Sequence, residues 1–148
     1  MMESSIDIML VEDNPNDIEL AVYAFRKNNI ESRTVIVRDG IEALDYIFSR
    51  GRYAERRPQD IPRIILLDLK LPKLNGLEVL KQIKSDDTMK KIPIIALTTS
   101  KEHSDVNSCY ALGVNSYIVK PVVFAEFAEA IRLVVAYWLT LNHFPTRE

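Results

Sequence analysis

The sequence predicts an α/β fold in which helices cover both faces of a doubly wound parallel sheet. Segments with strand character alternate with segments of helical periodicity five times along the 148 residues. Residues 64–67, Ile-Ile-Leu-Leu, are apolar on both sides of the chain, which is typical of a strand buried on both faces. A carboxylate, Asp68, follows this strand directly, at the edge where open α/β sheets bind their ligands.

The first strand–helix pair has the clearest boundaries. Residues 6–11 form an apolar strand that ends at two acids. Asn14 and Pro15 then predict a helix start, because Asn is a preferred N-cap and Pro fits the first helical position. The helix is expected to close at residues 28–29, Asn-Asn.

The middle of the chain contributes the second and third pairs. Residues 34–37 are a β-branched strand, and the Asp-Gly pair at 39–40 begins the second helix. An arginine-rich polar segment, 50–62, is interpreted as a surface loop before the strand at 64–67. Apolar residues from Leu77 onward at helical spacing predict the third helix.

The last two pairs follow the same pattern. Residues 93–97 are an apolar strand, and 101–112 form a weakly amphipathic helix that stops at Gly113. The fifth strand, 116–119, precedes the last and most apolar helix, predicted at 122–142.

Composition narrows the possible functions. The chain is 47% hydrophobic and 27% charged, and its net charge of -2 gives no electrostatic reason to expect nucleic acid as a partner. The single cysteine, Cys109, excludes an internal disulfide and a cysteine-rich zinc site. No signal peptide or membrane span is recognisable, so we expect one cytoplasmic domain over residues 1–148, with 143–148 as a short tail and no output domain.

Four of the five strands end in polar residues that could act together. These are Glu12 and Asp13 after the first strand, Asp68 after the third, Thr98 at the end of the fourth, and Lys120 after the fifth. If the first and third strands are neighbours, three carboxylates crowd together and repel, and a hard cation such as Mg²⁺ relieves that repulsion.

The same group suggests chemistry at phosphorus. Asp68 could attack phosphorus as a nucleophile, with Lys120 and the metal offsetting charge on the phosphoryl oxygens and the Thr98 hydroxyl donating to one of them. Each residue also has a simpler interpretation, such as a helix-terminal charge, a turn cap, a strand end or a solvated surface lysine. Their joint placement at strand ends favours the functional interpretation.

Four sequence stretches carry a family resemblance over roughly residues 6–142: LVEDNPND, ILLDLKLPKLNGLEVL, IPIIALTTS and GVNSYIVKP. Together they resemble the receiver domains of response regulators. The resemblance implies a flavodoxin-like (βα)5 fold with strand order 2-1-3-4-5 and a signalling role in a two-component phosphorelay. It also implies no enzymatic activity beyond self-phosphorylation and autodephosphorylation.

The resemblance also assigns roles to individual residues. Asp68 would accept the phosphoryl group from a histidine kinase, while Glu12, Asp13 and the backbone carbonyl of Lys70 would complete the Mg²⁺ site with it. Thr98 and Tyr117 would be the switch pair, with Tyr117 turning inward on phosphorylation, and Lys120 would bind the phosphoryl group. The Lys120–Pro121 peptide bond is expected to be cis.

A narrower resemblance points to standalone receivers that partner bacterial phytochrome-type histidine kinases. It rests on VRDGIEALDYIF, GRYAERRP, the TTS that ends the fourth strand, and AYWLTLNHFP. Three positions depart from the commonest receiver pattern: Glu12 replaces an Asp, Lys70 places a cation two residues after Asp68, and Ser100 is small. We expect Lys70 and Ser100 to tune the phosphoryl lifetime; the sequence leaves the sign open, because Lys70 could shield the phosphate or orient water.

The last helix indicates how a signal could be passed on. An apolar stripe is expected to face the sheet, consisting of Phe124, Phe127, Ala128, Ile131, Val134, Val135 and Trp138. Apolar residues near its end exceed what one helix end can bury, and they predict a homodimer through the last helix and fifth strand. The candidate interface residues are Tyr137, Trp138, Leu141 and Phe144.

Three other functions compete with this interpretation. A haloacid-dehalogenase-type phosphatase shares the strand-end Asp and Mg²⁺, but it needs a second Asp where this chain has Lys70. A flavodoxin-like cofactor binder would offer hydroxyls and glycine to a phosphate, whereas Glu12 and Asp13 would repel one. A receiver-like interaction module that works without phosphorylation is the remaining alternative.

Overall fold

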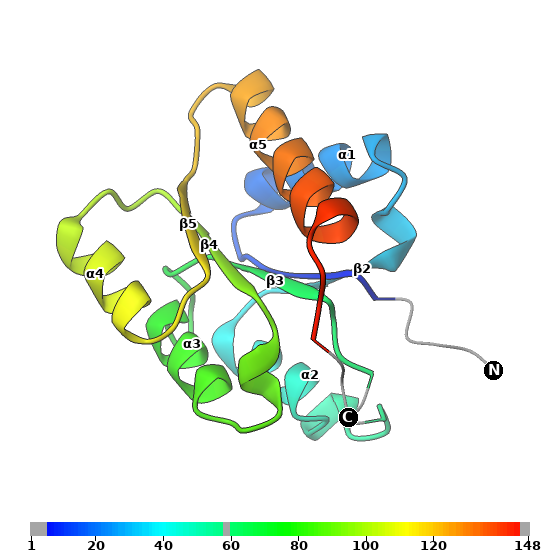
Figure 1. Cartoon of the computed structure of the whole chain (residues 1–148), viewed down its shortest axis with the longest axis vertical. Helices are drawn as coiled ribbons and strands as arrows, with labels where there is room; N and C mark the ends of the chain where they lie inside the picture. Colours follow the sequence, from blue (N-terminus) through cyan, green and yellow to red (C-terminus); the bar gives the residue numbers. More distant parts are fainter. Residues whose placement is uncertain (1–5, 58–59, 146–148) are drawn as a thin grey trace.

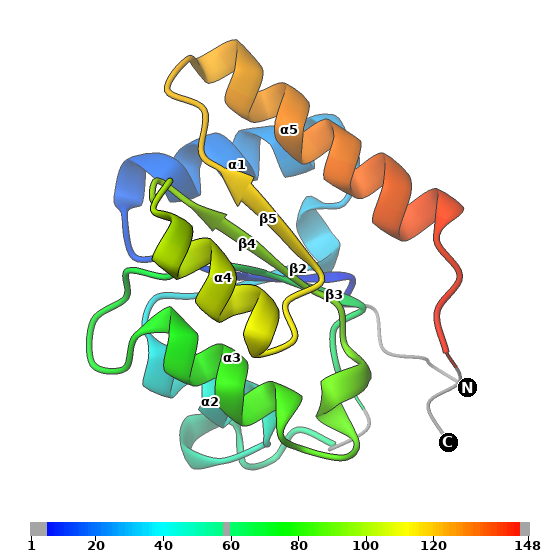
Figure 2. The same ribbon diagram turned by 60° about the vertical axis from the view of Figure 1, so that its left-hand side comes forward.

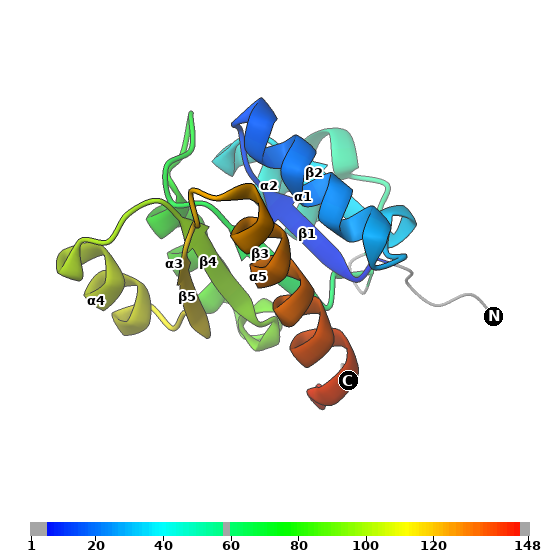
Figure 3. The same cartoon turned by 90° about the horizontal axis from the view of Figure 1, so that it is seen from above.

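Five parallel strands form the centre of the molecule in the computed structural model, which describes residues 6–57 and 60–145. The strand order is β2-β1-β3-β4-β5, so the predicted doubly wound fold and its order are confirmed. Figure 3 shows the strands side by side, from β5 at one edge to β2 at the other. The strands are β1 (Ile8–Val11), β2 (Thr34–Val37), β3 (Ile64–Leu67), β4 (Ile94–Thr98) and β5 (Ser116–Val119).

Helices cover both faces of this sheet, as Figures 1 and 2 show. Two of them, α1 and α5, pack together on one face, while α2, α3 and α4 lie on the other. Each face therefore has its own apolar core, one on either side of the buried strands. The helices are α1 (Pro15–Lys27), α2 (Gly40–Ile47), α3 (Gly76–Lys84), α4 (His103–Ala111) and α5 (Phe124–Ala136).

The register of β1 and β3 places Glu12 and Asp68 close together. Val11 of β1 pairs with Leu67 of β3, and every residue of these two strands is buried. The next residue of each strand is therefore an acid at the same edge of the sheet. The Asp68 amide also donates to the Val11 carbonyl at 3.0 Å, which continues the parallel ladder into the site.

Side-chain caps begin two of the helices as predicted. The Asn14 side chain accepts hydrogen bonds from the first-turn amides of α1, and Pro15 occupies the first helical position. The Asp39 side chain caps α2 in the same way. At the start of α3, Gly76 lies so close to the loop after β3 that a Cβ would fall 2.4 Å from the Asp68 carbonyl oxygen. A glycine is thus required where α3 approaches the loop that contains Asp68.

The last helix differs from its predicted form. α5 begins at Phe124 instead of residue 122, because Val123 is extended, and it continues into a π-helical segment, η4 (Tyr137–Leu141). Phe124 was predicted to face the sheet, but 47% of it is exposed and its ring packs against Tyr23 of α1 with a centroid separation of 5.5 Å. Among the residues that the structure describes, no helix is long and apolar enough to span a membrane.

Candidate functional site

Three carboxylates meet at the C-terminal edge of the sheet. Glu12 and Asp13 follow β1 and Asp68 follows β3, and each offers an oxygen within 4.8 Å of the other two. Glu12 and Asp68 are buried, whereas Asp13 is exposed to solvent. The structure thus brings together the three acids that the sequence placed at the ends of two different strands.

The ammonium of Lys120 lies among buried carboxylates. Its Nζ is 2.7 Å from Glu12 Oε1 and 3.0 Å from Asp68 Oδ2, and its side chain is 6% exposed. A third carboxylate, Asp17 Oδ2, lies 2.7 Å from the same nitrogen. The charge of this buried cation is fully compensated by its carboxylate partners.

Burial and charge shift the acid–base behaviour of this group. Burial raises the pKa of Glu12 to about 7, although the hydrogen bond from Lys120 opposes the rise. Burial alone would lower the pKa of Lys120, but hydrogen bonds to Asp17 and Glu12 and the charge of Asp68 raise it above its ordinary value. Lys120 is therefore a permanent cation at neutral pH.

The donor set suits a hard divalent cation. Carboxylate oxygens are preferred ligands of Mg²⁺ and Ca²⁺, and the three acids converge from two neighbouring strands. The exposed position of Asp13 leaves one side of the group open to solvent. The Lys70 amide donates to Asp68 Oδ1 at 3.2 Å, so the backbone that carries the predicted carbonyl ligand lies beside the Asp68 carboxylate.

Thr98 and Tyr117 lie on adjacent strands beside the acids. Thr98 is fully buried at the end of β4, and its carbonyl accepts a 2.7 Å hydrogen bond from the Lys120 amide. Tyr117 of β5 is half-buried, and its hydroxyl donates to the Ser100 carbonyl at 2.9 Å. The Ser100 hydroxyl in turn donates to Asp105 of α4. These contacts link β4, β5 and α4 next to the acid group.

The Lys120–Pro121 peptide bond differs from the expectation. No cis peptide bond occurs among the described residues, so this bond is trans. The trans form is the lower in energy for X–Pro bonds, by about 0.5–1 kcal/mol. Lys120 reaches all three of its carboxylate partners from the trans backbone.

Asp17 is the member of this group that the sequence did not reveal. It lies in the first turn of α1, where an acid also interacts favourably with the positive end of the helix. No local pattern pointed to this role, because its partner Lys120 lies 103 residues away in the sequence.

The four candidate dimer residues separate into two pairs. Tyr137 and Leu141 are 49% and 69% exposed. Trp138 and Phe144 instead pack against the core on the α1 and α5 side of the sheet, and the Arg63 guanidinium lies 4.6 Å from the centre of the Phe144 ring. Only the first pair forms part of the outer surface of the helix end.

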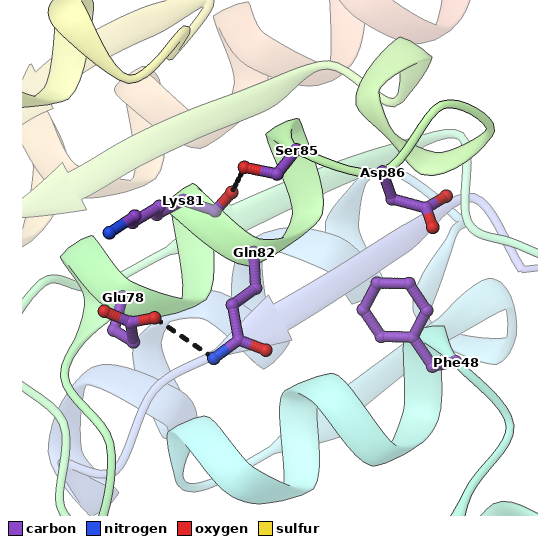
Figure 4. A pocket seen from close by; sticks show the side chains of 6 residues that line it. All are labelled: Phe48, Glu78, Lys81, Gln82, Ser85 and Asp86. Carbon is purple, nitrogen blue, oxygen red and sulfur yellow. Dashed lines mark hydrogen bonds between the residues drawn. The ribbon is translucent and has the colours of Figure 1, made fainter.

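A shallow groove lies away from the acid group, between α2 and α3. Figure 4 shows Phe48 on one side and Glu78, Lys81, Gln82, Ser85 and Asp86 on the other. Its volume is about 260 Å³, and its charged groups are of both signs. None of the residues assigned to the strand-end site lines this groove.

Comparisons with known proteins agree with this geometry. Residues 8–132 match the family model described as response regulator receiver domain. The chain is 39% identical over 143 residues to the probable methanogenesis regulatory protein FilR2 of Methanothrix harundinacea, covering 97% of this chain and 90% of FilR2. It is 37% identical over 132 residues to the response regulator Rcp1 of Synechocystis sp., covering 89% of this chain and 88% of Rcp1.

Two solved structures are also closely similar. The phosphorylated cyanobacterial phytochrome response regulator RcpA is 40% identical, with a TM-score of 0.88 over 95% of this chain and 99% of RcpA. The Mn²⁺-bound form of Rcp1 is 34% identical, with a TM-score of 0.87 over 95% of this chain and 99% of the Rcp1 chain.

Proposed function

Because the chain belongs to the response regulator receiver family, we propose that it accepts a phosphoryl group from a sensor histidine kinase onto Asp68. The observation that carries this assignment is the convergence of Glu12, Asp13 and Asp68 around an open site, with the Lys120 ammonium beside the nucleophile. The chain thereby acts as a response regulator in a two-component phosphorelay.

The transfer itself requires little of the protein beyond positioning. An oxygen of Asp68 attacks phosphorus and forms a P–O bond, while the P–N bond of the donor phosphohistidine breaks and the imidazole nitrogen keeps the electron pair. Lys120 then donates to a phosphoryl oxygen and offsets its negative charge, and the Thr98 hydroxyl donates to another. The later hydrolysis by water is the chain's own autodephosphorylation.

We infer that the resident cation is Mg²⁺, held by Glu12, Asp13, Asp68 and the Lys70 carbonyl. Hard oxygen donors and an open side support this choice, and the Mn²⁺-bound form of the similar Rcp1 supports a divalent ion. When bound, Mg²⁺ would neutralise charge on the transferring phosphoryl group.

The partner kinase is proposed to be of the phytochrome type. This rests on the similarity to RcpA, which is a phytochrome response regulator, and on the identity shared with Rcp1. A cytoplasmic location is proposed for the receiver together with this kinase. A phosphorylation-independent interaction module is disfavoured, because the three acids and Lys120 proposed for phosphoryl transfer lie close together.

The output is proposed to be a homodimer surface at the end of the last helix and the fifth strand. Tyr137 and Leu141 carry this proposal, since they expose apolar area on one side of η4. Leu141→Asp is expected to shift the protein from dimer to monomer in sedimentation velocity at micromolar concentration. Thr140→Asp, an exposed neighbour, is the control. A wild type that is monomeric both before and after phosphorylation would contradict the dimer.

Acetyl phosphate tests the phosphoryl-acceptor assignment directly. Wild type incubated with acetyl phosphate and Mg²⁺ should gain the mass of one phosphoryl group, and the attack then releases acetate. Asp68→Asn keeps the shape of the side chain but removes the nucleophile, so it should gain nothing. An unmodified wild type would instead favour the interaction module.

A further inference from the structure

Lys120 has one carboxylate partner that does not belong to the acid group. Its three ammonium hydrogens have three anionic acceptors, Glu12, Asp17 and Asp68. Glu12 and Asp68 are also members of the group of acids that can hold a cation, whereas Asp17 is not. Lys120 and a divalent cation therefore compete for the same two carboxylates, and Asp17 stands outside that competition.

Asp17 is held in a defined position. It lies in the first turn of α1, where its backbone amide donates to the Asn14 side chain at 3.1 Å. The helix packs along α5, whose preceding loop carries Lys120. The side chain of Asp17 is 24% exposed and that of Lys120 is 6% exposed, so their 2.7 Å contact is partly shielded from water. A charge-assisted hydrogen bond in such a place is strong.

We propose that Asp17 is a positioning residue that holds the Lys120 ammonium while Glu12 and Asp68 bind the divalent cation. In this role it lowers the cost of releasing the two acids from Lys120. It also keeps the ammonium beside Asp68, with two hydrogens free for phosphoryl oxygens. This inference rests on the proposed function, because it concerns the same metal and phosphoryl site.

Removal of Asp17 should have two effects of the same sign on metal binding. Lys120 would pair more strongly with Glu12 and Asp68, so a cation would have to displace it from both. The site would also lose one negative charge. The second effect is general to any nearby acid, whereas the first is specific to the residue that contacts Lys120.

The first measurement is calorimetric titration of the unphosphorylated full chain with MgCl₂. We expect Asp17→Asn to weaken Mg²⁺ binding by at least about tenfold, the lower end of what loss of a hydrogen bond between charged groups costs. Glu19→Gln is the matched control, because Glu19 is an exposed acid of α1 that is not among the three partners of Lys120. It should change the affinity by less than about twofold.

The second measurement follows Lys120 itself. In Mg²⁺-saturated wild type, the Nζ of Lys120 should give a protected ammonium signal in ¹⁵N NMR spectra, assigned with Lys120→Met. Asp17→Asn should lose that protection while its circular dichroism spectrum and amide spectrum stay folded. A purely structural role for Asp17 at the helix terminus would leave the ammonium signal unchanged.

The outcomes separate this inference from the proposed function. In one case wild type binds Mg²⁺ and is phosphorylated, but Asp17→Asn binds Mg²⁺ as tightly as wild type or as tightly as Glu19→Gln. The positioning role is then wrong and the proposed function stands. Retention of the Lys120 signal in Asp17→Asn would overturn it equally. If wild type neither binds Mg²⁺ nor accepts phosphate, the proposed function itself fails.

Discussion

The Tyr117 hydroxyl donates a 2.9 Å hydrogen bond to the backbone carbonyl of Ser100, across the space between β5 and the segment after β4. The ring of Tyr117 packs on the core shared by α2, α3 and α4. Because the Ser100 hydroxyl contacts Asp105 of α4, this one bond connects the edge strand to the helix beside it. A residue expected to act as a switch thus has a defined anchor next to the proposed phosphoryl site.

Tyr117→Phe should remove that anchor while leaving the ring in place. A hydrogen bond of this kind contributes about 0.5–1.5 kcal/mol, so the melting temperature should fall by roughly 1–6 °C. Thermal melts followed by circular dichroism measure this. Tyr110→Phe is the control, because 52% of Tyr110 is exposed on α4. An equal change in both variants would mean that the Ser100 contact contributes nothing.

Lys70→Asn should speed the loss of the phosphoryl group from Asp68. Lys70 is exposed at the site, whereas Ser100 is buried and its hydroxyl is occupied by Asp105, so Lys70 is the residue able to cover the phosphoryl oxygens. Removing its charge should raise the hydrolysis rate by about tenfold, a change of about 1.4 kcal/mol in the barrier. The decay of phosphorylated mass after removal of acetyl phosphate gives this rate.

The control for Lys70 is Lys73→Asn, because Lys73 is a nearby exposed lysine that pairs with Asp39 at 3.5 Å. Its backbone φ is +68°, a conformation that Asn tolerates well. Unchanged decay in Lys70→Asn, or the same acceleration in both variants, would exclude a specific shielding role for Lys70.

Asp13→Asn should stabilise the metal-free protein and abolish its stabilisation by Mg²⁺. The three acids repel one another without a cation, so neutralising one relieves repulsion and should raise the melting temperature in EDTA by roughly 2 °C. The same change removes a metal ligand, so added Mg²⁺ should no longer raise it. Asp87→Asn, on an exposed acid distant in sequence, should retain the Mg²⁺ response. A full response in Asp13→Asn would remove Asp13 from the metal site.

Lys84 gives the fold a pH-dependent stability. Its Nζ donates to the carbonyls of Lys90 and Ile92 and to Asn115 Oδ1 at 2.8–3.0 Å, and burial lowers its pKa to about 8. Below pH 8 the lysine is charged in both folded and unfolded chains, so its burial costs free energy in full. Between pH 8 and the unfolded value near 10.5 the folded form loses its proton first, and stability rises.

Lys84→Met isolates this effect because methionine does not titrate and all other groups are shared. The unfolding free energy of wild type relative to Lys84→Met should increase by on the order of 1 kcal/mol from pH 7 to pH 9.5. Urea denaturation at the two pH values measures the difference. A difference that is constant with pH would show that the three oxygen acceptors hold the lysine charged throughout.

Local patterns determined most of the fold. A fully apolar strand such as residues 64–67 is stable only when both of its faces are buried. The Asn14–Pro15 and Asp39–Gly40 pairs specify helix starts through the hydrogen bonds and dihedral angles of their own residues. These signals act within a few residues. The prediction that Phe124 faces the sheet was wrong because its position depends on a distant residue. Periodicity alone could not reveal that its ring packs against Tyr23 of α1, outside the core.

The sequence by itself determined that acids, a hydroxyl and a lysine end four strands, and that these residues meet at one edge of a parallel sheet. Only the tertiary structure decided which carboxylates the Lys120 ammonium contacts. Two of them are distant in the sequence, since Asp68 lies 52 residues and Asp17 lies 103 residues from Lys120. It also decided which apolar residues of the last helix are covered, burying Trp138 in part and leaving Leu141 outside. Contacts of such long range depend on the packing of α1 against α5, which no local pattern encodes.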